Sequence, residues 1–238
     1  MLKFETRSDE TEIMDDLDCK GEVVDQTLRE LETINALLGG NYVTINGIYK
    51  LLKANNFPPH VSIADLGCGG GDILKLIARG ESKYNAKLNL TGIDANPNII
   101  EFAIKNTSDA LNIRYEAVDV LSDEFKSRKY DVIVGTLFFH HFSSKQLTDL
   151  LRQIKSQARI GIVINDIHRH WFAYYSIKLI TRLFSRSAMV KFDAPQSVRR
   201  AFRKSDLLEI LLNAGIDNFS IRWMWAFRWQ IVVFNNQA

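Results

Sequence analysis

Four of the five histidines lie in two short segments of the chain, His140 with His141 and His168 with His170. Each segment follows a run of apolar residues. An imidazole has an ordinary pKa near 6.5, so it can act as a general base at neutral pH, bind a metal ion, or pack as a hydrogen-bonded core residue. What the rest of the chain binds decides among these roles.

A glycine-rich stretch, "ADLGCGGGD", follows a short apolar run and precedes a helical pattern. Gly67, Gly69 and Gly71 allow a tight turn and a close approach of the backbone to a ligand. A dinucleotide fingerprint would place its third glycine at position 72, where this chain has Asp72. No P-loop motif is present either, so the turn is predicted to bind a ligand without a diphosphate.

Two carboxylates end the next two predicted strands, Asp94 in "TGIDANP" and Asp119 in "EAVDVL". A carboxylate at the first position can accept two hydrogen bonds from the hydroxyls of a ribose. An acid at the second position can accept one from an exocyclic amine such as that of adenine. Together with the glycine turn, the two acids indicate a nucleoside site.

Strand-like and helical patterns alternate from residue 60 to residue 167, which predicts a parallel sheet covered by helices on both faces. Near the end of the chain, "FSIRWMWAFRWQIVVF" contains two strand-like runs with no room for a helical crossover, so they should pair antiparallel. We therefore expect an α/β fold with a doubly wound, Rossmann-like, seven-stranded sheet, mostly parallel with an antiparallel C-terminal hairpin. Ligands of such sheets bind at the carboxyl ends of the strands.

Residues 1–56 are predicted to form an N-terminal arm and a helical cap, and residues 57–238 the core domain. The arm is acidic, with seven Asp or Glu residues between positions 5 and 18 against Arg7. Two helical patterns follow, the first stopped by Gly39 and Gly40.

The connection at 168–203 is longer than the fold needs, and we interpret it as a helical lid. Its first half is apolar on nearly all sides, and the cations Lys178, Arg182 and Arg186 recur every four residues. Two interpretations compete: a lid over an apolar substrate, which we favour, or a helix lying on a membrane surface as a peripheral contact.

The motifs "DLGCGGGD", "GIDANP", "EAVDVL" and "YDVIVGTLFFHHF", in this order, resemble those of the class I S-adenosylmethionine-dependent methyltransferases. The resemblance covers about residues 60–238 and implies S-adenosyl-L-methionine as cofactor. The whole-chain pattern is also similar to bacterial small-molecule methyltransferases associated with polyketide-forming enzymes. The cofactor-binding residues that the resemblance implies are Asp65, Gly67, Cys68, Gly69, Asp94, Ala95, Asp119, Val120, Gly135 and Thr136.

Within that class, the histidines favour methylation of an oxygen, because a phenol must lose a proton when it accepts the methyl group. We expect a small apolar acceptor, phenolic or polyketide-derived, with His141 as base and His140 as substrate-orienting or structural residue. A metal site is less favoured, because the loop "FFHHF" offers no acid. The substrate-binding candidates are His168, Arg169, Trp171 and Tyr175.

The alternatives are an RNA or protein methyltransferase and a non-catalytic cofactor-binding accessory subunit. A net charge of +2 and the absence of an N/D-P-P-Y motif argue against a nucleic-acid substrate. The polar N-terminus and the lack of an apolar run of about 18 residues favour a cytoplasmic location. Monomer and homodimer both stay open.

Overall fold

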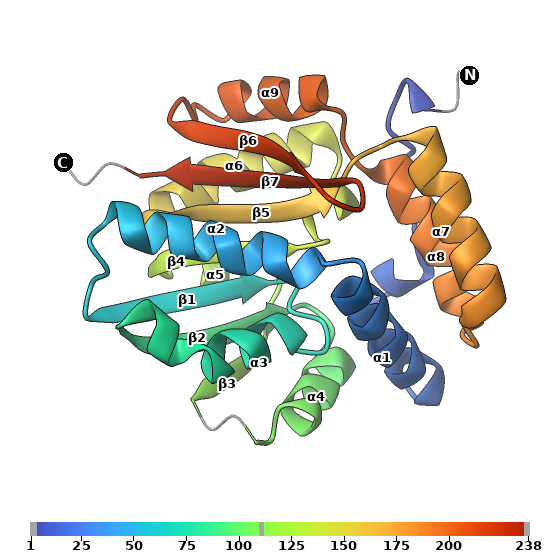
Figure 1. Ribbon diagram of the computed structural model, residues 1–238, viewed down its shortest axis with the longest axis horizontal. Coiled ribbons are helices and arrows are strands. Elements are labelled where there is room, and N and C mark those ends of the chain that lie inside the picture. The colour runs from blue at the N-terminus through green and yellow to red at the C-terminus, as the bar shows by residue number, and fades with distance from the viewer. Residues whose placement is uncertain (1–3, 110–111, 236–238) are drawn as a thin grey trace.

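The computed structural model describes residues 4–109 and 112–235, and its centre is a seven-stranded sheet with the order β3-β2-β1-β4-β5-β7-β6 (Figure 1). β7 pairs antiparallel with both of its neighbours, and the other strands run parallel to one another. This confirms the predicted Rossmann-like sheet with its antiparallel C-terminal hairpin. The strands are β1 (His60–Leu66), β2 (Lys87–Asp94), β3 (Ile113–Ala117), β4 (Tyr130–Thr136), β5 (Ala158–Ile167), β6 (Phe219–Met224) and β7 (Arg228–Phe234).

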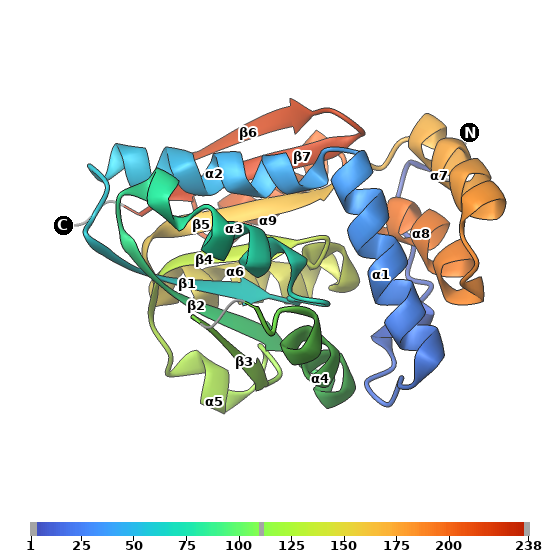
Figure 2. The same ribbon diagram turned by 60° about the horizontal axis from the view of Figure 1, so that its bottom comes forward.

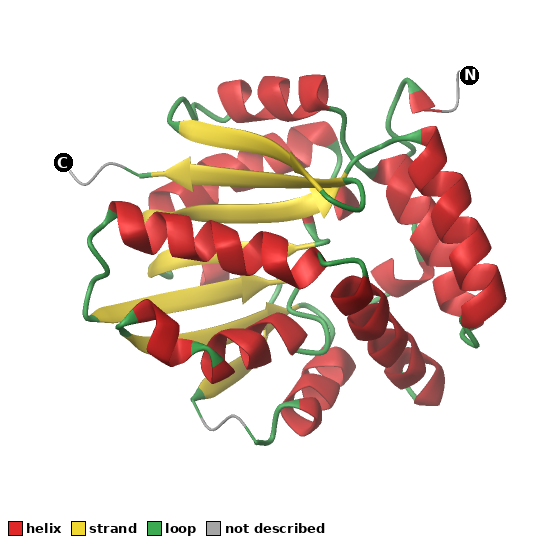
Figure 3. Cartoon of the chain, in the orientation of Figure 1, coloured by secondary structure: helices red, strands yellow, loops and turns green. Residues whose placement is uncertain are grey.

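Helices cover both faces of the sheet, and further helices lie beyond the carboxyl ends of its strands (Figure 3). The helices are α1 (Glu22–Leu37), α2 (Gly40–Ala54), α3 (Asp72–Arg79), α4 (Pro97–Asn106), α5 (Asp123–Lys126), α6 (Ser144–Gln157), α7 (Trp171–Phe184), α8 (Ala188–Arg200) and α9 (Lys204–Asn213). Three short 3-10 turns complete the elements used below: η2 (Ile13–Asp15), η3 (Glu81–Tyr84) and η4 (Phe139–His141).

Two hydrophobic cores lie on opposite faces of the sheet. Alternate side chains of a strand point to opposite faces, so Ile63 of β1 joins the core under α2 and α3, while Leu66 joins the core under α6 and α9. β4 divides in the same way, with Val132 on the first face and Ile133 on the second. Strands buried on both faces are expected in a parallel sheet that is covered by helices.

A layer of helices from two distant parts of the chain lies beyond the carboxyl ends of the strands (Figures 1 and 2). α1 contacts α4 and α8, and η2 contacts α8. A small apolar cluster joins these helices: Val24 and Leu28 of α1 pack with Ile99 of α4 and Met189 of α8. The cap over this edge is therefore built from the N-terminal residues and from the 188–200 segment together.

The cap contains only some of the helices expected from the sequence. α2 was expected in an N-terminal cap at 1–56, but its residues Ile48, Leu51 and Leu52 pack against the sheet. α7 was expected to be part of a lid at 168–203, but it packs on the outer side of α8 (Figure 2). Helical periodicity shows that a helix has an apolar face and does not show which neighbour that face meets.

Candidate functional site

A cavity of about 500 Å³ lies at the carboxyl edge of the sheet, enclosed by the strand ends, η2, α1 and α8. Most of the residues proposed from the sequence line it, although they come from four different strand ends. The lining residues among them are Asp65, Gly67, Cys68, Gly69, Asp94, Ala95, Asp119, Val120, Thr136, His140 and His141. Gly135 is the one cofactor candidate that does not line the cavity; it lies under the ring of Phe139, where a side chain would collide.

The glycine turn between β1 and α3 has the backbone that its sequence predicted. Gly67, Gly69 and Gly71 have φ angles of +63°, +50° and +76°, in the left-handed region that favours glycine. A Cβ atom on Gly67 would lie 2.1 Å from the ring of Phe138. The turn therefore needs glycine both for its conformation and for the close approach of Phe138.

One part of the cavity holds an excess of carboxylates. The buried Asp65 has an Oδ1 atom without a hydrogen-bond partner among the described residues. Burial, with Asp72 and Asp94 nearby, raises the pKa of Asp65 well above its ordinary value. Arg200 is the only arginine among the described residues that line the cavity, no lysine lines it, and the lining acids are Glu12, Asp15, Glu32, Asp65, Asp72, Asp94 and Asp119. Such a lining suits a ligand that carries positive charge.

Asp94 and Asp119 lie where strand ends meet the cavity. Asp94 accepts hydrogen bonds from the backbone N–H groups of Asn96, at 3.0 Å, and of Gly69, at 3.4 Å. These bonds fix the carboxylate at the end of β2, beside the glycine turn. Asp119 accepts a bond of 2.9 Å from the N–H of Leu121 and remains exposed. Both acids keep free lone pairs for a ligand.

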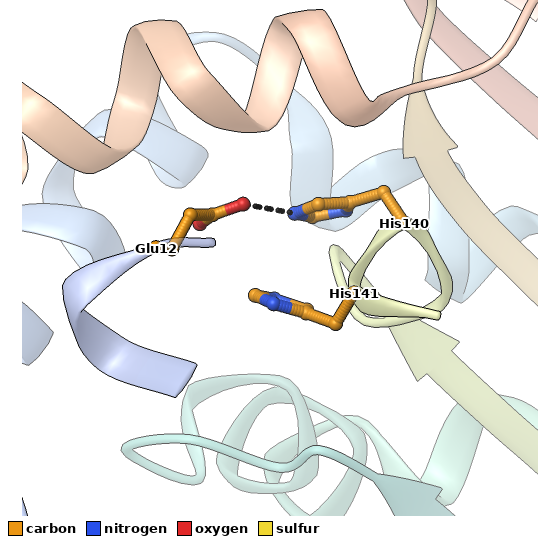
Figure 4. Close-up of side chains that lie close together, drawn as sticks. All are labelled: Glu12, His140 and His141. Atoms are coloured by element: carbon orange, nitrogen blue, oxygen red, sulfur yellow. Dashed lines mark ion pairs between the residues drawn. The ribbon is translucent and has the colours of Figure 1, made fainter. Parts of the chain in front are cut away.

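His140 is a buried ion-pair residue (Figure 4). Its Nδ1 lies 2.8 Å from Oδ1 of Asp166, and its Nε2 lies 3.5 Å from Oε1 of Glu12. Burial lowers the pKa of His140, but the two carboxylates outweigh burial and raise the pKa to about 9. The imidazole is therefore protonated at neutral pH, which makes it a poor base and a firm link between the N-terminal arm and β5.

His141 forms a different arrangement, a hydrogen-bonded pair with a carboxylate from the N-terminal arm. Its Nδ1 lies 2.5 Å from Oδ1 of Asp15, and no hydrogen bond to its Nε2 occurs among the described residues. Arg200 holds the pair, since its Nη1 donates to Asp15 and its Nη2 donates to the backbone oxygen of His141. Burial raises the pKa of Asp15, but the bonds from His141 and Arg200 outweigh it and leave that pKa below its ordinary value.

Glu12, His140 and His141 are close enough for a metal ion, with one ligand-type atom from each within 4.8 Å of the others. Both imidazoles also have a carboxylate on Nδ1, which is common around metal-bound histidines. Against this, the cation Arg200 lies 3.4 Å from Glu12 and also contacts Asp15, so a metal ion there would lie close to a positive charge. We therefore interpret the group as an ion-pair cluster.

The four substrate-binding candidates do not line the cavity. Arg169 is buried and donates to Asp206 and to the backbone oxygens of Ala201, Phe4 and Glu5, so it holds the start of the chain in place. His168 accepts a hydrogen bond from Trp223, and burial lowers its pKa to about 4. Trp171 and Tyr175 are exposed on α7. These four side chains therefore lie outside the cavity: contacts with the start of the chain and with β6 hold Arg169 and His168, and α7 extends away from the cavity. Their role in substrate binding stays a prediction.

The residues that sequence reasoning missed are Glu12, Asp15 and Arg200, with Arg7 as a support. Arg7 donates to the backbone oxygens of Phe142 and His140, and so fastens the arm to the histidine turn. Two sequence features could have indicated the contact between the arm and α8: the acidic run at 5–18 and the basic pair Arg199 and Arg200. Charge alone could not show which acid meets which base.

Comparisons with known proteins show what the chain is similar to. Residues 63–161 match the family described as "Methyltransferase domain". A human protein named "Probable tRNA methyltransferase 9B" is 31% identical over 102 residues, which cover 43% of this chain and 19% of that protein. A malonyl-[acyl-carrier protein] O-methyltransferase of Priestia megaterium is 31% identical over 107 residues, 44% of this chain and 36% of that protein. The matches thus span well under two thirds of these relatives.

A solved structure extends the likeness to most of the chain. The plantazolicin methyltransferase BpumL, in complex with a triazolic desmethylPZN analog and SAH (S-adenosylhomocysteine), superposes with a TM-score of 0.64. The superposition covers 88% of this chain and 90% of that chain at 17% identity, a level that shows a common fold.

Fold and site together define an α/β protein with a ligand cavity at the carboxyl edge of a Rossmann-like sheet. Within that class, residues 63–161 match a methyltransferase domain, and the motif order is that of the class I S-adenosylmethionine-dependent methyltransferases. The family resemblance seen in the sequence is confirmed.

Proposed function

We propose that this protein methylates an oxygen atom of a small apolar acceptor, phenolic or polyketide-derived, with S-adenosyl-L-methionine as cofactor. The observation that carries the proposal is the Asp15–His141 pair at a cavity whose other part is rich in carboxylates. The carboxylates suit the charge of the cofactor, and the pair suits an acceptor that loses a proton.

The carboxylate-rich part of the cavity fits the cofactor on its own chemistry. S-adenosylmethionine supplies a methyl group on a positively charged sulfonium, and it also carries an ammonium group and a ribose. The buried, unpartnered Oδ1 of Asp65 would gain a donor from such a ligand. Asp94 would accept from the ribose hydroxyls, with Ala95 beside it, and Asp119 with Val120 would hold the adenine.

His141 is the residue that we assign as the base. An acceptor hydroxyl near Nε2 would pass its proton to that nitrogen, while Asp15 orients the ring through Nδ1 and stabilises the imidazolium. His140 has a carboxylate at each ring nitrogen, so its role in the proposal is to position the arm rather than to take a proton. Met14, Leu17, Phe138 and Phe142 add apolar surface for the acceptor.

The test is turnover of methyl-labelled S-adenosylmethionine with a panel of apolar phenols, followed by chromatography of the labelled products. We expect an O-methylated product from at least one phenol. Label that enters RNA or protein but none of the phenols would contradict the acceptor class.

Calorimetry of cofactor binding tests the nucleoside assignment separately. Asp94→Ala should weaken binding at least about tenfold, because two charge-assisted hydrogen bonds are lost. Asp109→Ala, at an exposed acid outside the cavity, is the matched control and should bind normally. Equal affinity in the two variants would refute the assignment of Asp94 to the ribose.

A further inference from the structure

α7 exposes a long apolar surface on the outside of the molecule. Trp171, Tyr175, Leu179 and Leu183 follow one another at intervals of four residues and therefore form one row along the helix. All are exposed, and Leu183 and Phe184 reach 64% and 79%. The helix buries only Ala173 and Thr181. None of α7 lines the cavity, so substrate binding does not explain this surface.

The turn between β6 and β7 lies near the N-terminal end of α7 (Figure 1). Its side chains add to the apolar surface of the helix. Phe227 of that turn stacks on His170 with ring centroids 5.2 Å apart and lies 5.9 Å from Phe172. Trp223 and Trp225 on the same hairpin are 49% and 74% exposed. Trp and Tyr are the side chains enriched at membrane–water interfaces, where an apolar ring meets a polar edge.

The charged side chains that α7 and the residues just after it carry are all positive, although Glu30 of α1 accepts a hydrogen bond from the backbone N–H of Arg186. Lys178, Arg182, Arg186 and Lys191 are exposed, and their side chains form no ion pair within residues 4–109 and 112–235. Residues 167–192 contain no Asp or Glu, and neither do residues 218–235. Lys178 and Arg182 lie four residues apart on α7, so they run beside the apolar row, and Arg186 follows just after the helix ends.

We propose that α7 and the β6–β7 turn bind the interface of an anionic lipid bilayer, with the apolar row in the headgroup region and the cations on lipid phosphates. A second copy of this chain fits less well, because a twofold contact would bring the unpaired cations close to each other. No helix of the described residues is long and apolar enough to cross a membrane, which is consistent with binding at the surface. The proposal does not depend on which acceptor is methylated.

Sedimentation of the full chain with vesicles tests the proposal. We expect binding to vesicles of phosphatidylcholine and phosphatidylglycerol, weak binding to phosphatidylcholine alone, and release by high salt. The triple variant Lys178→Gln, Arg182→Gln, Arg186→Gln should bind at least about tenfold more weakly, since it removes three charges that attract the anionic surface. Leu179→Ser with Leu183→Ser should also reduce binding.

The matched control removes three positive charges elsewhere: Lys53→Gln, Lys83→Gln and Lys87→Gln, at exposed positions of α2, η3 and β2 without ion pairs in the described part of the chain. It should bind vesicles like the wild type, with circular dichroism showing that every variant is folded. Three results would overturn the proposal. These are no binding to anionic vesicles, an equal loss in the control, or a dimer in ultracentrifugation that the two serine substitutions dissolve while vesicle binding is absent.

Discussion

Two adjacent histidines on one 3-10 turn have different chemistry because different carboxylates hold them. His140 has a carboxylate at each ring nitrogen and a pKa of about 9. His141 lines the cavity and is hydrogen-bonded to one carboxylate, that of Asp15, with no hydrogen bond to its Nε2 among the described residues. The preference for His141 as base came from the sequence, but its physical reason lies in these contacts.

Replacing His141 tests the proton transfer. His141→Ala should lower kcat for a phenol by about a hundredfold at neutral pH, the lower range of general-base catalysis, and part of the loss should return at high pH, where the phenol ionises by itself. His60→Ala, at an exposed position at the start of β1, serves as control and should keep full activity. A loss with His141→Ala that is the same at every pH would contradict the role of base.

Asp15→Asn belongs to the same measurement. The carboxylate stays charged across the assay range, because its pKa lies below the ordinary value. Without that charge the imidazolium that forms when His141 takes a proton is less stabilised, so kcat should fall about tenfold. An unchanged kcat would show that Asp15 has only a structural role.

At the scale of elements, the turn from β1 to α3 combines unusual backbone angles with a close contact. Gly67→Ala places a methyl group in a left-handed conformation and against Phe138. The conformation costs about 1 kcal/mol and the collision adds about 1–3 kcal/mol. The variant should be less stable in urea unfolding and should bind cofactor more weakly, since Phe138 also lines the cavity.

A second glycine separates the two causes. Gly215 also has a left-handed φ, +73°, but a Cβ atom there meets nothing within 4 Å. Gly215→Ala should therefore lose only the conformational part of the free energy of unfolding. If both variants were destabilised equally, the contact with Phe138 would have no measurable cost.

At the scale of the whole molecule, His140 connects three regions: the arm through Glu12, β5 through Asp166, and its own turn after β4. Its pKa rises from 6.5 to about 9 on folding, so the folded protein binds this proton more tightly than the unfolded chain does. The stabilisation is complete below about pH 6.5 and is lost as the pH rises through about 9.

Urea unfolding at several pH values measures this contribution. His140→Gln cannot titrate, so the difference in free energy of unfolding between wild type and variant should be large near pH 6 and should shrink toward pH 10. His60→Gln is the control for the loss of a histidine as such. A difference that does not change with pH would mean that His140 contributes by packing and hydrogen bonding alone.

Much of the fold could be predicted because its signals are local. The alternation of strands and helices and the glycines of the first turn are properties of short segments, and the parallel sheet follows from their order. Asp94 and Asp119 were placed at the carboxyl edge for the same reason, since Asp94 ends β2 and Asp119 follows the end of β3 by two residues.

The sequence by itself determined the sheet, the family motifs and the carboxyl edge as the place of the cavity. Only the tertiary structure decided what closes that edge: the arm with Glu12 and Asp15 and the helix with Arg200 cover the cavity, while α7 turns outward and Arg169 becomes a buried support. The pairing of Asp15 with His141 joins residues 126 positions apart. Such pairs depend on how whole elements pack against each other, and neither local periodicity nor net charge contains that information.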